Sequence, residues 1–312
     1  MYNGMGALIL ARSCYSFGYG VETPARLVSS VPPGAAGVIL ADSNGLHGQA
    51  EFGAAAASAG IRAGAGARLR IGSANVVLLS LSGGWPSLSK AVSGAATGAS
   101  ADDLPDGCGG GLAVLVFRAE GSAAVRGSGF TGPVLGAVLP PGFGVPPEEA
   151  ERAFMAAGIT PAACWPVVFT GIESVRVHRL VRASSLGGVE ASLPGRAFAS
   201  PHAMMPDRAE LDRAFAGCRP SLAGASEIAS CLDIFRPAGR LLMSVCDGGS
   251  AEALRAVARE EYRRRYGRGA AARRLEMELS SIAEAGLAGY FLAFGEVARF
   301  CAAEGIAATA RG

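Results

Sequence analysis

Side chains that bind transition metals are few and scattered in this sequence of 312 residues. The three histidines are His47, His178 and His202, and no two of them have metal-ligand spacing within one helix or strand. We expect His47 to pack against its neighbours, His178 to lie on a solvated helix face, and His202 to lie in a loop. None of the three is expected to act as a metal ligand or a catalytic base.

The sequence also gives little support for a catalytic cysteine or serine nucleophile. The seven cysteines form no Cys-x-x-Cys pair, and their odd number and wide spacing are typical of buried free thiols in a reducing cytosol. No Gly-x-Ser-x-Gly motif lies between a predicted strand and a predicted helix. The Gly-rich stretch at 107–111 lacks the Lys-Ser/Thr ending of a phosphate-binding loop, so we interpret it as a connector. The cysteines are Cys14, Cys108, Cys164, Cys218, Cys231, Cys246 and Cys301.

Arginines gather near the C-terminus. Residues 251–274 hold eight Arg and three Glu, whereas the whole chain has a net charge of only +2. Two interpretations remain open: a solvated helix face laced with charge, or a surface that contacts phosphate backbones without sequence specificity. The candidate phosphate contacts in this segment are Arg263, Arg264, Arg265, Arg273 and Arg274.

Predicted strands alternate with predicted helices over the first 200 residues, and these elements would position any functional site there. Continuous apolar runs bounded by Gly, Pro or Ser predict strands that are buried on both faces. Helix-like segments separate them, so the order of elements predicts an α/β fold, either a barrel or an open doubly wound sheet. The stretches at 94–111 and 120–145 are interpreted as loops. We predict strands at 8–10, 37–40, 76–79, 112–116 and 167–169, and helices at 24–30, 49–59 and 146–157.

The pattern becomes entirely helical from about residue 250. Three helices are expected, through Leu254 and Val257, through Leu275 and Leu279, and through Phe291. A domain boundary is placed between 235 and 250, which gives domains at 1–240 and 241–312. No apolar run reaches the roughly 18 residues that a membrane span needs, and the N-terminus is not typical of a secretion signal. A cytoplasmic protein without membrane contact is expected.

Short motifs occur in a fixed order along most of the chain. They include Ser13-Cys14-Tyr15-Ser16-Phe17, Gly60-Ile61-Arg62, Glu227-Ile228-Ala229, Asp247-Gly248, Gly289-Tyr290-Phe291-Leu292 and Arg311-Gly312. This collinear set resembles the bacterial DNA polymerase III alpha subunit, in particular its error-prone branch. The resemblance implies that 1–240 form a distorted α/β barrel, the polymerase-and-histidinol-phosphatase (PHP) domain, and that 241–312 form the helical start of the polymerase palm.

The same resemblance implies that the metal site of the PHP barrel is degenerate. The family's His-x-His motif corresponds to Leu10 and Arg12, and Asp42 is kept but Ser43 follows it in place of histidine. The family's glutamate corresponds to Ala67. Its Asp-x-His motif corresponds to Ile172 and Ser174. One carboxylate does not hold a metal cluster, so we expect no bound metal, no catalytic residue and no phosphoesterase activity, with Asp42 acting as a turn or helix-cap residue.

The resemblance also sets expectations for cofactors and partners. In the family, an Arg-Gly pair leads into a turn that holds nucleotide phosphates, which makes Arg311 and Gly312 further candidate phosphate contacts. The palm aspartates that bind magnesium lie downstream of this pair, so no cofactor is expected for this chain. Expected partners are DNA, bound weakly and without specificity, and the remainder of a polymerase or other replication and repair subunits.

Three functions follow as hypotheses. The first is the N-terminal PHP portion of an error-prone polymerase III alpha-type protein that is catalytically inactive alone, in a family of DNA-directed DNA polymerases. The second is a free-standing degenerate PHP protein that binds or scaffolds other components. The third is a phosphoesterase with an unrecognised site, which we disfavour because the ligand positions are replaced.

Overall fold

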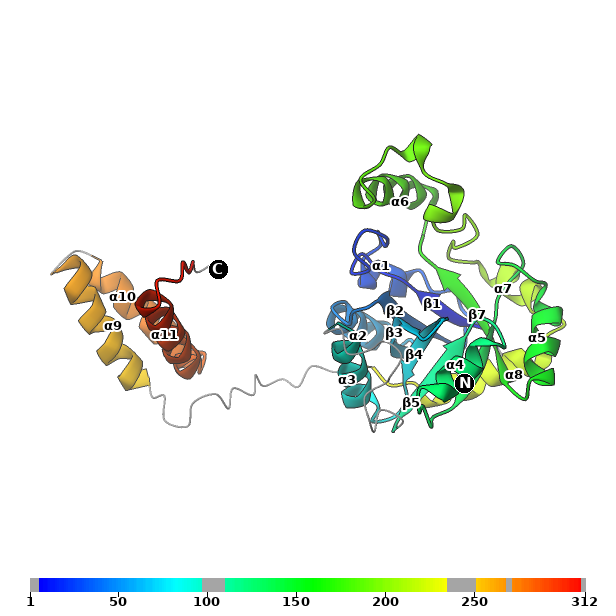
Figure 1. The fold of residues 1–312 in the computed structure, drawn as a ribbon, viewed down its shortest axis with the longest axis horizontal. Helices are drawn as coiled ribbons and strands as arrows, with labels where there is room; N and C mark the ends of the chain where they lie inside the picture. The colour runs from blue at the N-terminus through cyan, green and yellow to red at the C-terminus, as the bar shows by residue number, and fades with distance from the viewer. Residues whose placement is uncertain (1–5, 97–109, 235–250, 268–270, 310–312) are drawn as a thin grey trace. The chain divides into compact units, whose positions relative to one another are not determined.

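The structure is a computed structural model that describes residues 6–96, 110–234, 251–267 and 271–309. It divides into two compact units, residues 1–237 and residues 238–312, which Figure 1 colours along the chain. The boundary expected at 235–250 falls on residues outside those described. Each unit is considered by itself below.

Unit 1 contains a closed barrel of seven strands in sequential order. Neighbouring strands are parallel except where β4 pairs antiparallel with β3 and with β5. β7 pairs with β1 and closes the barrel. The strands are β1 (Leu8–Ala11), β2 (Gly37–Ser43), β3 (Ala63–Ile71), β4 (Ala74–Ser80), β5 (Leu112–Val116), β6 (Val134–Val138) and β7 (Thr160–Val167).

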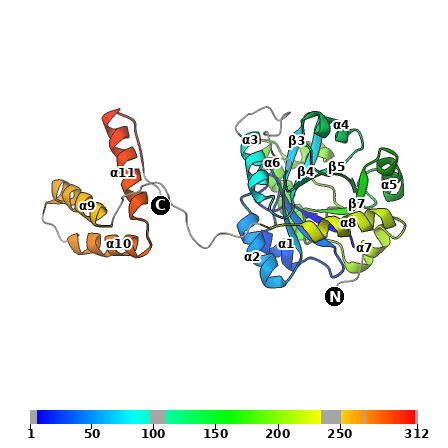
Figure 2. The same ribbon diagram turned by 90° about the horizontal axis from the view of Figure 1, so that it is seen from below.

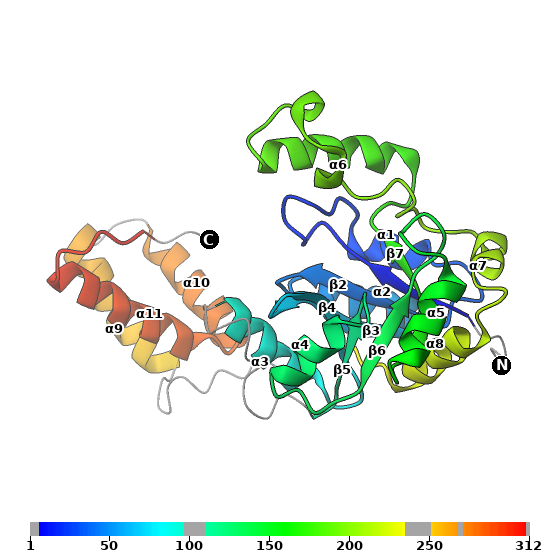
Figure 3. The ribbon, with the colours of Figure 1, turned by 45° about the vertical axis from the view of Figure 1, so that its right-hand side comes forward.

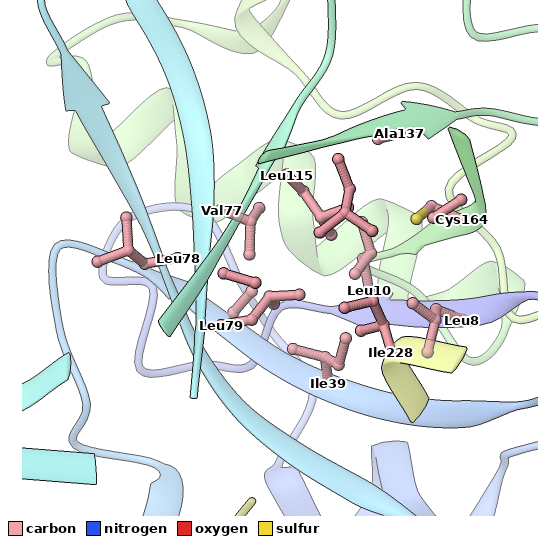
Figure 4. Packing of buried hydrophobic residues seen from close by; sticks show 14 of the residues in the cluster. Leu8, Leu10, Ile39, Val77, Leu78, Leu79, Leu115, Ala137, Cys164 and Ile228 are labelled. Atoms are coloured by element: carbon pink, nitrogen blue, oxygen red, sulfur yellow. The ribbon is translucent and has the colours of Figure 1, made fainter. Parts of the chain in front are cut away.

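Large aliphatic side chains fill the interior of the barrel. Leu10, Ile39, Leu79 and Leu115 come from four different strands and are fully buried in one cluster. Figure 4 shows these side chains meeting, with Ile228 contributed from outside the strands. The interior is therefore a packed core and not an open channel.

The strand predictions were correct for the aliphatic runs and incomplete elsewhere. The runs at 8–10, 37–40, 76–79 and 112–116 form β1, β2, β4 and β5. The strand expected at 167–169 is wrong in its bounds, because β7 ends at Val167. β3 was not predicted, and the expected loop at 120–145 is wrong because it contains helix α4 and strand β6.

Helices surround the strands, as Figure 2 shows. The helices expected at 24–30, 49–59 and 146–157 are confirmed as α1, α2 and α5. The loop expected at 94–111 is wrong at its start, because α3 continues to Ala96. The helices are α1 (Pro24–Ser29), α2 (Gln49–Ala59), α3 (Trp85–Ala96), α4 (Gly121–Gly127), α5 (Pro147–Ala156), α6 (Ile172–Ser185), α7 (Arg208–Ala214) and α8 (Arg219–Cys231), with 3-10 turns at Glu190–Ser192 and Gly195–Ala197.

Helix α6 differs from the others in its position. Figure 3 shows it apart from the remaining helices and over the loop that follows β1. Two contacts join it to that loop: His178 Nδ1 lies 2.6 Å from the carbonyl oxygen of Tyr19, and Arg182 Nη1 donates to the carbonyl oxygen of Gly18 at 3.0 Å. α6 therefore helps to hold the β1–α1 loop.

The described part of unit 2 has three helices: α9 (Ala251–Tyr266), α10 (Ala272–Glu284) and α11 (Ala288–Ala303). Leu254, Leu279 and Ala288 form its small buried core. The three helices were expected from the sequence. Nowhere in the described residues is a helix both long enough and apolar enough to cross a bilayer.

One close helix–strand approach gives a test of the barrel packing. A Cβ atom on Gly224 of α8 would lie 2.1 Å from the carbonyl oxygen of Pro161 in β7. We expect Gly224→Ala to lower the free energy of unfolding by about 1–3 kcal/mol, because backbone must move to admit the methyl group. Urea unfolding measures the change. Gly127→Ala in α4, where no atom lies within 4 Å of the added carbon, is the matched control and should change little.

Candidate functional site

A pocket opens at the end of the barrel where the parallel strands β1, β2 and β5 finish. Its volume is about 510 Å³. Active sites of α/β barrels form at this end, because the loops that follow the strands converge there. We call it the mouth pocket. Its lining residues are Arg12, Ser43, Asn44, Arg68, Leu69, Arg70, Asn75, Val76 and Phe117.

Two arginines dominate the mouth pocket. The guanidinium of Arg12 lies over the ring of Tyr19 at 4.5 Å from its centroid, and that of Arg68 lies over Phe117 at 5.4 Å. Both residues are partly exposed, but both Nε atoms are buried and have no hydrogen-bond partner. In the part of the chain that the structure describes, neither arginine takes part in an ion pair within 4.0 Å.

Burial of the two arginines disfavours their charged forms and lowers both pKa values. The pKa of Arg68 is lowered to about 9, chiefly because burial disfavours the charged form and secondly because the positive charge of Arg12 is near. Burial also lowers the pKa of Arg12, and Tyr19 and Asp42 partly oppose that shift. A guanidinium remains protonated at neutral pH, so two positive charges line the mouth pocket.

Asp42 lies beside this pocket, and its carboxylate already accepts hydrogen bonds from protein donors. Its Oδ1 accepts hydrogen bonds from Ser13 N at 2.8 Å and from the Ser16 hydroxyl at 2.7 Å. Its Oδ2 accepts from the Ser13 hydroxyl at 2.7 Å. Burial raises the pKa of Asp42, while the hydrogen bonds from Ser16 and Ser13 oppose that shift. Asp42 is the last residue but one of β2, as expected for a strand end, but it caps no helix and forms no turn: its hydrogen bonds fix the loop after β1.

The other ligand positions inferred from the resemblance lie apart. Leu10 and Ala67 are fully buried in the barrel core. Ile172 is 66% exposed at the start of α6. The Ser174 hydroxyl donates to Glu22 Oε1 and not into the mouth pocket. Only Arg12 and Ser43 of the seven positions line the pocket, and the side chain that follows Ala67, Arg68, does so as well.

Glu22 is a second buried carboxylate that the sequence reasoning missed. Its Oε1 accepts hydrogen bonds from Thr170 N at 2.8 Å and from the Thr170 hydroxyl at 2.6 Å, and its Oε2 pairs with Arg26 at 3.3 Å. These bonds tie the loop before α1 to the segment between β7 and α6. Across the described residues, no group of three or more His, Cys, Asp or Glu side chains is arranged to hold a metal ion.

His178 is buried, which corrects the expected solvated position. It is fully inaccessible and packs edge-on against Tyr19 and Phe169. Its Nε2 accepts from Ala199 N at 2.9 Å, so Nδ1 carries the proton and donates to the Tyr19 carbonyl. Burial lowers the pKa of His178, which favours this neutral form.

The other two histidines are exposed. His47 lies 5.9 Å from the ring of Phe17, and His202 lies in a loop beside Phe143. Neither lines the mouth pocket. The loop position expected for His202 is confirmed.

The candidate phosphate contacts that the structure describes in unit 2 fall into two groups. Arg264 and Arg265 both pair with Glu261, and Arg274 pairs with Glu278 at 2.8 Å. Arg263 and Arg273 are exposed, and no ion pair between described residues includes either of them. Arg311 and Gly312 lie outside the described residues. The charged helix face is therefore partly self-neutralised.

Comparisons with known proteins do not identify a family. No family model matches the sequence, and no curated protein matches it. Among solved structures, the chain is similar to an amidohydrolase from Chromobacterium violaceum with bound sulfate and no metal, at 18% sequence identity and a TM-score of 0.27. That match covers 64% of this chain and 93% of the other. A likeness this low carries no conclusion about this chain.

The hydrogen bonds of Asp42 give a test of the site's framework. We expect Asp42→Ala to lower the free energy of unfolding by about 3 kcal/mol or more, because it leaves the Ser13 amide and two serine hydroxyls buried without an acceptor. Chemical denaturation measures the loss. Ser43→Ala, at the next residue of β2, should cost far less. Equal small effects of the two substitutions would contradict the bracing role of Asp42.

Proposed function

We propose that unit 1 is a PHP-type barrel without a working metal site, and that the chain is the non-catalytic front portion of an error-prone DNA polymerase III alpha-type protein. The observation that carries the proposal is the pair of guanidinium groups in the mouth pocket. They stand at the end of the barrel where the family that the sequence resembles binds its metals.

Electrostatics support the non-catalytic part of the proposal. A divalent ion about 5 Å from a single guanidinium is repelled by roughly 7 kcal/mol at an effective dielectric constant of about 20. Asp42 is the only carboxylate kept among the ligand positions, and both of its oxygens already accept hydrogen bonds. The mouth pocket thus favours anions over the cations that a PHP phosphoesterase needs.

The surface of unit 2 supports a role inside a larger protein. Helix α11 exposes the aromatic residues Tyr290, Phe291 and Phe294, which lie within one sector of the helix, and Phe294 is 56% exposed. The rings of Tyr290 and Phe294 are in contact, with centroids 4.6 Å apart and planes tilted by 46°. Contiguous exposed aromatic side chains mark surfaces that another protein segment covers. We assign this face to the remainder of the polymerase.

Reading the coding sequence beyond codon 312 tests the polymerase assignment. Palm carboxylates encoded in the same frame would support it. An open reading frame that encodes no such carboxylates would contradict it and would favour the free-standing scaffold.

Restoring three of the missing ligands tests the degenerate site. We expect the triple variant Leu10→His, Arg12→His and Ala67→Glu to remain inactive, because positions 43, 172 and 174 still lack ligands. The side chain at 67 also belongs to the buried core and not to the mouth pocket. Release of phosphate from p-nitrophenyl phosphate with Mn²⁺ is the measurement. Metal-stimulated release by the triple variant, or by the unaltered protein, would contradict the proposal.

The arginine groups of unit 2 give a test of DNA contact. We expect the full chain to bind duplex DNA weakly, and the double variant Arg263→Gln/Arg273→Gln to lower the slope of log affinity against log salt by about 2. These two arginines are exposed and take part in no ion pair between described residues, so their charge can meet phosphates.

The matched control for DNA binding is Arg264→Gln/Arg274→Gln. It removes the same total charge, but its arginines are paired with Glu261 and Glu278, so a smaller change is expected. Fluorescence anisotropy over a salt series measures both variants. An unaltered slope in the first variant would leave a solvated helix face as the better interpretation.

A further inference from the structure

The buried Nε atoms of Arg12 and Arg68 lack the partners that buried donors normally have. The only other buried side-chain nitrogen or oxygen without a partner, among the described residues, is Oε1 of Gln49. Leaving a buried charged donor unsatisfied is costly, and the two arginines that carry these donors both line one pocket. A ligand that meets the two partly exposed guanidinium groups in this pocket would supply acceptors that the protein does not.

The protein supplies no counter-charge inside the mouth pocket. None of its lining residues is acidic. Asp42 is the carboxylate whose charge is felt by both arginines, and it is occupied by Ser13 and Ser16. The rings of Tyr19 and Phe117 hold the guanidinium groups in place but do not neutralise them. The guanidinium of Arg182 also lies over the Tyr19 ring, 5.2 Å from its centroid, and brings a third positive charge close to Arg12.

Neutral polar groups complete the lining. Ser43 and Asn44 come from the end of β2, and Asn75 comes from the start of β4. Asn44 has a φ of 51°, which makes it the only non-glycine residue in the described chain with a left-handed backbone. Strained backbone of this kind clusters at ligand sites, and Asn tolerates it best. Hydroxyl and amide donors beside two guanidinium forks suit a tetrahedral oxyanion with several acceptors.

We propose that the mouth pocket binds a terminal phosphate, that is, a phosphomonoester held between Arg12 and Arg68. Its volume of about 510 Å³ exceeds what a bare phosphate needs and falls in the usual range for ligand pockets. The phosphate therefore belongs to a larger molecule, either a small metabolite or the 5′ end of a nucleic-acid strand. This site does not depend on the polymerase assignment, because it is built only from contacts within unit 1.

Thermal unfolding of the full chain tests the site. Inorganic phosphate and glycerol 3-phosphate should each raise Tm relative to chloride and glycerol at matched ionic strength. Arg68→Met and Arg12→Met should weaken the apparent affinity about 10- to 100-fold, as expected for a lost charge-assisted hydrogen bond. Arg152→Met is the control, since it removes an exposed arginine of α5 that does not line the pocket. Equal phosphate stabilisation of all three variants would overturn the proposal.

A direct measurement on the unaltered chain keeps the test decisive if the arginine variants fail to fold. The Nε–H groups of Arg12 and Arg68 should shift in proton–nitrogen spectra as glycerol 3-phosphate is added. Absence of any arginine Nε–H shift at millimolar ligand would overturn the proposal. Shifts confined to the arginines of α9 and α10 would overturn it as well.

Two further ligands separate the sources of the phosphate. The affinity of a short single strand with a 5′-phosphate is compared with that of the same strand carrying a 5′-hydroxyl. Contacts to the internal phosphates are the same in both strands, so the difference in affinity reports the terminal phosphate alone. Tighter binding of the phosphorylated strand, lost in Arg68→Met, supports the strand end. Binding of glycerol 3-phosphate without any preference between the two strands supports a small metabolite. If neither the 5′-phosphate nor glycerol 3-phosphate binds, the site does not exist.

Discussion

The hydrogen bonds between Asp42 and the two serines Ser13 and Ser16 determine the chemistry of the barrel mouth. They bury the carboxylate, fix the loop after β1, and use both of its oxygens. These three bonds use most of the acceptor sites of the carboxylate, and among the described residues Asp42 makes no ion pair with Arg12 within 4.0 Å. The positive charges of Arg12 and Arg68 are therefore only partly compensated by Asp42, and each guanidinium lies over an aromatic ring. In our proposal, the end of the barrel that binds metals in the PHP family binds an anion in this chain.

Helix α6 holds the loop that follows β1 and thereby positions Arg12. His178 is neutral and buried, and it fixes the backbone of Tyr19, whose ring in turn holds Arg12. Glu22 ties the same loop to Thr170 just before α6. The position of Arg12 thus depends on contacts made far along the chain. The hydrogen bonds of Glu22 and His178 thus hold the loop that carries Arg12, which preorganises this part of the barrel mouth.

The sequence predicted the parts of the fold that rest on local patterns. Aliphatic runs gave four of the strands, whereas β3 was missed because its Ala-Gly-Ala-Gly-Ala start lacks large side chains. The resemblance pointed to Ala67, but Arg68 lines the pocket, and neighbouring strand residues face opposite sides. The bonds of Glu22 and Asp42 join residues 148 and 29 positions apart, so no local pattern could have indicated them.

Anomalous diffraction from crystals of the full chain is the most direct measurement of whether the mouth selects anions over cations. Separate soaks in manganese and in tungstate, a heavy analogue of phosphate, place each ion without reference to activity. The account predicts a tungstate peak within hydrogen-bond distance of Arg12 and Arg68, with no manganese at Asp42. Manganese bound at Asp42, with no tungstate at the two arginines, would contradict it.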